Sequence, residues 1–119
     1  MNDDSVKRIE RGWGAHFVGA PECYFRRNTL LELGTRRIIV STVGNYHGTL
    51  EPIGSGRVYE TMVFQALWTG RYWDADINRQ ASVNVIPTCL PIGSDDEDAN
   101  QMHERVVEAV VAILEANDD

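Results

Sequence analysis

The chain has 119 residues, of which 43% are hydrophobic; this is the size of one domain and enough apolar material to exclude wholesale disorder. No apolar run reaches the roughly 18–20 residues that cross a bilayer, and the formal net charge of −7 disfavours binding to duplex nucleic acid. We therefore expect a single domain over residues 1–119, located in the cytoplasm and without a membrane partner.

The first 87 residues carry the signals of a β structure. Residues 1–11 are polar and are predicted to be poorly ordered or loosely helical. From residue 12 onwards, glycines and polar breaks separate runs rich in Val, Ile, Tyr, Phe, Thr and Trp, which is typical of strands. Strands are predicted at 13–18, 24–31, 36–43, 58–68, 72–79 and 81–86, with a long loop at 44–56.

Residues 94–117 change to a helical period. Ser94 with Glu97 three residues later predicts a capping box at the start of this helix. Strands followed by one terminal helix indicate an α+β fold. We expect a mostly antiparallel sheet of about five or six strands, arranged as a meander of hairpins, with the long C-terminal helix packed on one face.

Two arginine pairs flank the first predicted hairpin, in "FRRNTLLELGTRRIIVST". A turn at Leu33-Gly34 places Arg27 and Arg36 on one face and Arg26 and Arg37 on the other. Because each pair is split between opposite ends of the hairpin, the pattern favours arginines along the rim of the sheet. A phosphate-binding role for Arg26 or Arg27 remains the alternative.

The second hairpin, around Thr69-Gly70, predicts which face the helix covers. A two-residue turn there places Ala66 opposite Trp73, Phe64 opposite Ala75 and Met62 opposite Ile77. This face is apolar, so we expect the helix to pack on it.

Candidates for chemistry are few. Asp74 and Asp76 share one face of a strand, but two aspartates at this spacing specify little, and the pattern favours a solvated polar face over a ligand pair. The three histidines are scattered and form no zinc motif, so we predict no metal, no cofactor and no catalytic residue. If the protein binds a small molecule, the pool of ligand-binding residues is Arg27, Tyr59, Tyr72, Asp74, Asp76 and His16.

The helix has an apolar arc of roughly 200°, wider than the roughly 100° that a surface helix needs. The apolar side chains beyond those roughly 100° predict a second surface that buries them, either a partner subunit in a homodimer or an N-terminal segment of this chain. The residues expected at that interface are Met102, His103, Val106, Val107, Val110, Val111 and Leu114.

The stretches "FRRNTLLELGTRRIIVSTVG", "YETMVFQA" and "YWDADI", with the helix "NQMHERVVEAV", resemble small uncharacterised proteins of bacterial mobile elements, chiefly prophages. The resemblance implies an accessory protein and carries no activity or site residue with it. We expect a non-enzymatic module that binds a host or phage protein through its acidic helix and sheet surface. The alternative is a small-molecule-binding protein or small enzyme, with a site on the polar sheet face or in a dimer cleft.

Overall fold

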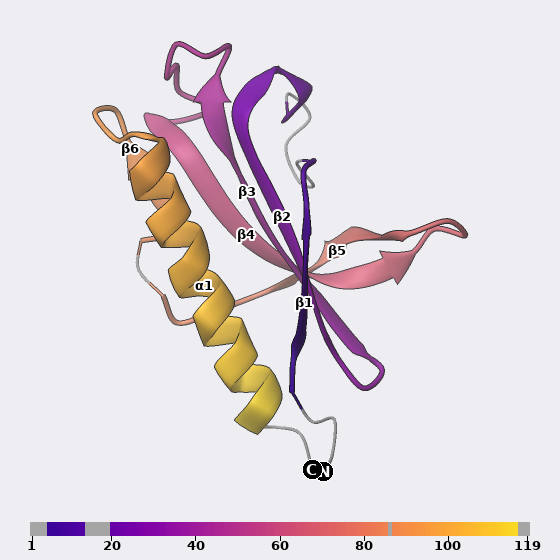
Figure 1. The fold of residues 1–119 in the computed structure, drawn as a ribbon. Helices are drawn as coiled ribbons and strands as arrows, with labels where there is room; N and C mark the ends of the chain where they lie inside the picture. Colours follow the sequence, from indigo (N-terminus) through magenta and orange to yellow (C-terminus); the bar gives the residue numbers. More distant parts are fainter. Residues whose placement is uncertain (1–4, 14–19, 86, 117–119) are drawn as a thin grey trace.

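A computed structural model describes residues 5–13, 20–85 and 87–116 of the chain. It confirms the α+β fold: an antiparallel sheet with one long helix across one face (Figure 1). The strands run in the order β1-β2-β3-β4-β5, and the short β6 pairs with β4. The elements are β1 (Lys7–Arg11), the 3-10 helix η1 (Ala20–Glu22), β2 (Cys23–Leu33), β3 (Arg36–Tyr46), β4 (Arg57–Trp68), β5 (Trp73–Ala81), β6 (Cys89–Pro91) and α1 (Asp96–Ala116).

The first strand corrects the prediction that residues 1–11 are poorly ordered. Residues 7–11 form β1, which pairs with β2 along its whole length. Its polar side chains are bonded to the helix and to β2, so a polar sequence here does not mean a disordered one. The strand predicted at 81–86 is also wrong over residues 82–85, which follow β5 as irregular chain. The strand predicted at 13–18 lies almost wholly outside the described residues.

The hairpin of β2 and β3 has the predicted faces but a different turn. Leu33 pairs with Arg36, so the turn is Gly34-Thr35 and the register is shifted by two residues. Gly34 has a φ of 62°, which glycine adopts without strain at the first central position of a tight turn. An even shift preserves the faces, and Arg27 and Arg36 both lie on the side of α1.

The hairpin of β4 and β5 departs further from the prediction. Its turn has four residues, because Trp68 pairs with Trp73, and the register then shifts between Phe64 and Ala66. Phe64 lies opposite Gln80 instead of Ala75. The helix packs on the other side of β4, where Val63 joins its core cluster. The prediction of the helix-covered face is therefore wrong. Both sides of β4 carry buried apolar side chains, Phe64 on one and Val63 on the other, so an apolar face alone did not identify the side on which the helix packs.

The helix starts one residue later than its sequence signal suggests. Asp95 and Asp98 form the capping box: the backbone N–H of Asp98 donates to Asp95 Oδ1 at 2.9 Å, and that of Asp95 donates to Asp98 Oδ2 at 3.0 Å. The predicted box of Ser94 and Glu97 is replaced by this one. Two aspartates so placed also complement the positive end of the helix dipole.

The wide apolar arc of α1 is covered within the chain. Met102, His103, Val106, Val107, Val110 and Leu114 are all buried, and Val111 is partly buried against the same core. The covering groups come from β2, β3 and β4, with Val6, Val83 and Val85 at the margins. The arc therefore no longer requires a second subunit, and the homodimer, which was expected from this arc, stays a prediction.

Candidate functional site

His103 has no exposed surface and forms the centre of a buried hydrogen-bonded chain. Its Nε2 lies 2.7 Å from Thr29 Oγ1, and its Nδ1 lies 2.7 Å from Thr42 Oγ1. Thr42 Oγ1 is in turn 2.5 Å from Thr61 Oγ1, and Thr29 Oγ1 is 3.0 Å from both carboxylate oxygens of Glu10. These partners lie on β1, β2, β3 and β4, so the chain crosses the sheet beneath the helix.

The direction of each bond in this chain follows from Glu10, because an ionised carboxylate only accepts. The hydroxyl of Thr29 must donate to Glu10 and accept the Nε2–H of His103. Nδ1 of the ring is then unprotonated and accepts from the hydroxyl of Thr42, which accepts from that of Thr61. A neutral imidazole protonated at Nε2 therefore has both nitrogens satisfied.

Two arginines and two glutamates form a closed ring next to this chain, which we term the Arg–Glu ring: Arg8, Glu10, Arg27 and Glu104. Glu104 accepts from Arg8 and, at 2.8 Å, from Arg27. Glu10 accepts from Arg8 at 2.7 Å and from Arg27 at 2.9 Å. Hydrogen bonding from Arg8 lowers the pKa of Glu104 to about 2. Burial opposes ionisation of Glu10, but its bonds to the two arginines and Thr29 prevail and lower its pKa.

Together these groups join the helix to the sheet and do not present a catalytic base. Burial lowers the pKa of His103 from 6.5 to about 4, and the neighbouring Arg27 adds to this effect. A general base works best with a pKa near the operating pH and within reach of the substrate. His103 is enclosed and fully hydrogen-bonded, which is the ordinary state of a buried polar side chain.

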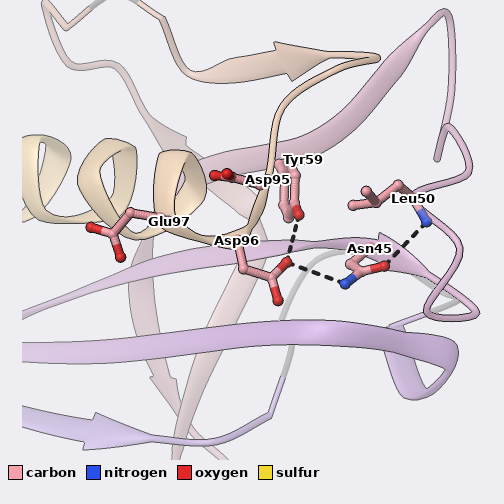
Figure 2. A pocket seen from close by; sticks show the side chains of 6 residues that line it. All are labelled: Asn45, Leu50, Tyr59, Asp95, Asp96 and Glu97. Carbon is pink, nitrogen blue, oxygen red and sulfur yellow. Dashed lines mark hydrogen bonds between the residues drawn. The ribbon is translucent and has the colours of Figure 1, made fainter.

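A depression of about 400 Å³ lies where the start of α1 meets the loop after β3. Figure 2 shows that Tyr59 and Asn45 both point toward Asp96. The Tyr59 hydroxyl donates to Asp96 Oδ1 at 2.5 Å, and Asn45 Nδ2 donates to the same oxygen at 3.2 Å. Burial and the Asp96 carboxylate raise the pKa of the Tyr59 phenol. The polar contacts here tie the loop to the helix.

The structure does not bring the predicted ligand-binding residues together. Arg27 belongs to the Arg–Glu ring. Tyr59 lies on β4, and its hydroxyl donates to Asp96 at the start of α1. Tyr72 lies at the tip of the second hairpin. Arg27 lies on β2, and Asp74 and Asp76 lie on β5, with β3 and β4 between them. Three strand spacings separate β2 from β5, which is about 14 Å. Each aspartate accepts a nearby backbone N–H, Asp74 from Ala75 and Asp76 from Asn78. The sixth residue, His16, lies outside the described residues.

Four aromatic side chains gather at the end of the hairpin of β4 and β5. We term Trp13, Trp68, Tyr72 and Trp73 the aromatic cluster. The rings of Trp13 and Tyr72 meet edge to face with centroids 5.6 Å apart, and those of Trp68 and Trp73 are 5.2 Å apart. Trp13, Trp68 and Tyr72 are 39%, 52% and 45% exposed. In Figure 1 this hairpin projects from the sheet on the side away from α1.

Two arginines hold the aromatic cluster in place. The guanidinium of Arg11 lies 4.5 Å from the Trp13 ring centroid, and that of Arg37 lies 4.5 Å from the Trp73 ring centroid. Arg11 also donates to the Trp73 carbonyl at 2.5 Å, and Arg37 pairs with Glu32 at 2.7 Å. Each arginine is therefore held by other contacts, and the rings it covers are fixed before any partner arrives.

Of this cluster, sequence reasoning placed only Tyr72 among the candidate binding residues, and it treated His103 as an apolar interface position. A usable signal existed for the histidine, since a polar residue on an apolar helical arc must find hydrogen-bond partners in the core. The sequence held no comparable signal for the aromatic cluster, because Trp13 is far in sequence from the hairpin that carries the other three rings.

Within the described residues, no group of three His, Cys, Asp or Glu side chains is placed to hold a metal ion. Nor does any helix in those residues combine the length and the apolar character needed to span a membrane. Compared with protein-family models, curated proteins and solved structures, the chain matches none of them. Its function is therefore inferred from its own geometry.

Proposed function

We propose that the protein is a non-enzymatic binding module that docks onto another protein. The exposed aromatic cluster carries this proposal. Trp, Tyr and Arg are the residues that contribute most to binding energy at protein interfaces, and rigid aromatic side chains lose little conformational freedom on binding. Arg11 and Arg37 cover Trp13 and Trp73, and these two rings contact Tyr72 and Trp68. The cluster can therefore meet a partner's surface without rearrangement of the sheet.

The outer face of α1 supports a partner that carries positive charge. Glu97, Glu108 and Glu115 are exposed on it, and Arg105 is the one arginine or lysine between residues 96 and 116. Such a field speeds association with a basic surface, and the gain falls as salt rises. Since the apolar face of the helix is buried against its own sheet, the proposed contact surfaces are the hairpin end and this acidic face.

A small enzyme has less support. The polar side chains predicted for a ligand site are dispersed, and His103 is enclosed. The further expectation that the partner is a host or phage protein rests on the sequence resemblance alone, and it stays a prediction.

Affinity capture from a bacterial lysate with matched variants tests the proposal. The variant is the double substitution Trp68→Ala and Tyr72→Ala, and the control is Ile92→Ala, which removes an apolar side chain that is 70% exposed and outside the aromatic cluster. We expect one stoichiometric partner to be captured by the wild type and the control. The double variant should lose it, because truncating an interface hot spot weakens binding about 30-fold or more.

Captured material is quantified by mass spectrometry at low and high salt, and circular dichroism confirms that each variant is folded. Weaker capture at high salt would support the role of the acidic face. If the double variant captured the same proteins in the same amounts as the wild type, the hairpin would not be the docking surface and the proposal would fail.

A further inference from the structure

A cavity of about 130 Å³ lies between the second half of α1 and the sheet, close to the segment that follows β5. We term it the Arg36 cleft. Its wall is mainly aliphatic and has two long polar side chains, Arg36 and Gln65. Ala81 and Ser82 also line it, and the larger aliphatic side chains are Ile38, Val63, Val83, Val110, Ile113 and Leu114.

Arg36 is the one charged residue among those that line the cleft. It is half-buried, and its Nη1 donates to the backbone carbonyl of Leu114 at 3.2 Å. The ion pairs formed among the described residues do not include it. By contrast, Arg8, Arg27 and Arg37 each pair with a carboxylate. The cleft thus combines a cation with an apolar wall and contains no acidic side chain.

The size of the cleft sets the size of what it can hold. A protein cavity of about 150 Å³ lined by Leu, Ile and Phe takes up benzene, so 130 Å³ fits one six-membered ring or a branched chain of similar bulk. A guanidinium beside such a cavity matches the planar geometry of a carboxylate and binds it through two parallel hydrogen bonds.

We propose that the Arg36 cleft binds a small apolar monocarboxylate, with the ring or branched chain against the aliphatic wall and the carboxylate on Arg36. This site goes beyond the proposed docking function and uses none of the aromatic cluster. The last carbonyls of α1 lie beside it, and the negative end of a helix dipole disfavours an anion. Binding of a carboxylate must therefore depend on Arg36, whereas binding of a neutral ring would not.

The test is a titration of the ¹⁵N-labelled full chain with benzoate, followed by amide chemical shifts. Benzyl alcohol serves as the probe with a ring and no charge, and acetate as the probe with a charge and no ring. Arg36→Gln removes the cation, and Arg79→Gln is the control at an exposed arginine outside the cleft. Ile113→Phe, at the rim of the cleft, narrows the cavity.

For benzoate we expect saturable shifts at the amides of Ser82, Val83, Val110 and Ile113. The binding efficiency usual for small ligands gives a dissociation constant of order 1 mM. Acetate, benzyl alcohol and the Arg36→Gln protein should each show binding at least tenfold weaker, while Arg79→Gln should bind as the wild type does.

Three results would overturn the proposal: no saturable shifts at the cleft, equal binding of benzyl alcohol and benzoate, or unchanged binding by Arg36→Gln. Should circular dichroism show that Arg36→Gln is unfolded, Ile113→Phe decides the matter. A folded Ile113→Phe protein that has lost benzoate binding supports the site, and one that retains it places the ligand elsewhere.

Discussion

The buried position of His103 makes the stability of the fold depend on pH. Burial holds its pKa at about 4 in the folded protein, against an ordinary value of 6.5. Between these values the unfolded chain binds more protons than the folded one does. The free energy of unfolding is therefore fully retained above pH 6.5 and falls as the pH drops through this window.

The size of the effect follows from the two pKa values. Lowering the pH from 7 to 5 should reduce the free energy of unfolding by about 2 kcal/mol through His103. The charged groups around the imidazole of His103 are those of the Arg–Glu ring: Arg8, Glu10, Arg27 and Glu104. The pKa of Glu104 is about 2 in the fold, against an ordinary 4.5, so its stability contribution is lost only as the pH falls below about 4.5. A measurement at pH 5 therefore reports mainly on the histidine.

The assay is urea unfolding of the wild type and of His103→Gln at pH 7 and pH 5. A glutamine stays neutral at both values and still offers a donor and an acceptor to Thr29 and Thr42. The variant should be less stable at pH 7, but its free energy of unfolding should change about 2 kcal/mol less between the two pH values. If both proteins lost the same amount between pH 7 and pH 5, the protonation of His103 would not be the cause and the reasoning would be refuted.

Three further substitutions test the packing around the site, each by urea unfolding. Gly44→Ala should destabilise the fold by more than about 2 kcal/mol, because a Cβ there would lie 2.3 Å from Tyr59 Cδ1. Gly12→Ala is the control and should be neutral, because a Cβ at that position would have no atom within 4 Å. Asp95→Ala removes the N-cap of α1 and should cost about 1 kcal/mol; no change would mean that this capping box contributes nothing. Thr42→Val leaves Nδ1 of the histidine without a partner and should cost about 1–3 kcal/mol; a neutral result would mean that the bond between Thr42 and His103 does not stabilise the fold.

The strands β2 to β5 and the helix α1 could be predicted from the sequence because their hydrophobic periods are strong, whereas β1 and the short β6 were not predicted. The details of strand pairing could not, since they depend on turn length. Moving the first turn from Leu33-Gly34 to Gly34-Thr35 shifted the register by two and preserved the faces. In the second hairpin, the four-residue turn and the bulge near Phe64 changed the partners on β5, and the helix was found on the other face of β4.

The buried site was less predictable than the fold. His103 meets Thr29 and Thr42, which are 74 and 61 residues away in the chain, and no local pattern announces such a meeting. The polar character of β1 was likewise misread, because Arg8 and Glu10 are bonded within the Arg–Glu ring. Charged strand residues are ordinarily a sign of solvent exposure, and here they mark the place where the helix is attached.

The position of α1 after all six strands has a consequence for how the protein folds. The face of the sheet that carries Thr29, Thr42 and Thr61, together with the valines around them, has no cover until residues 96–116 are available. Contacts such as that of Arg8 with Glu104, 96 residues apart, are formed only after long loops have closed, which slows folding. A chain truncated before the helix would leave this surface exposed, and partly folded chains of that kind tend to aggregate.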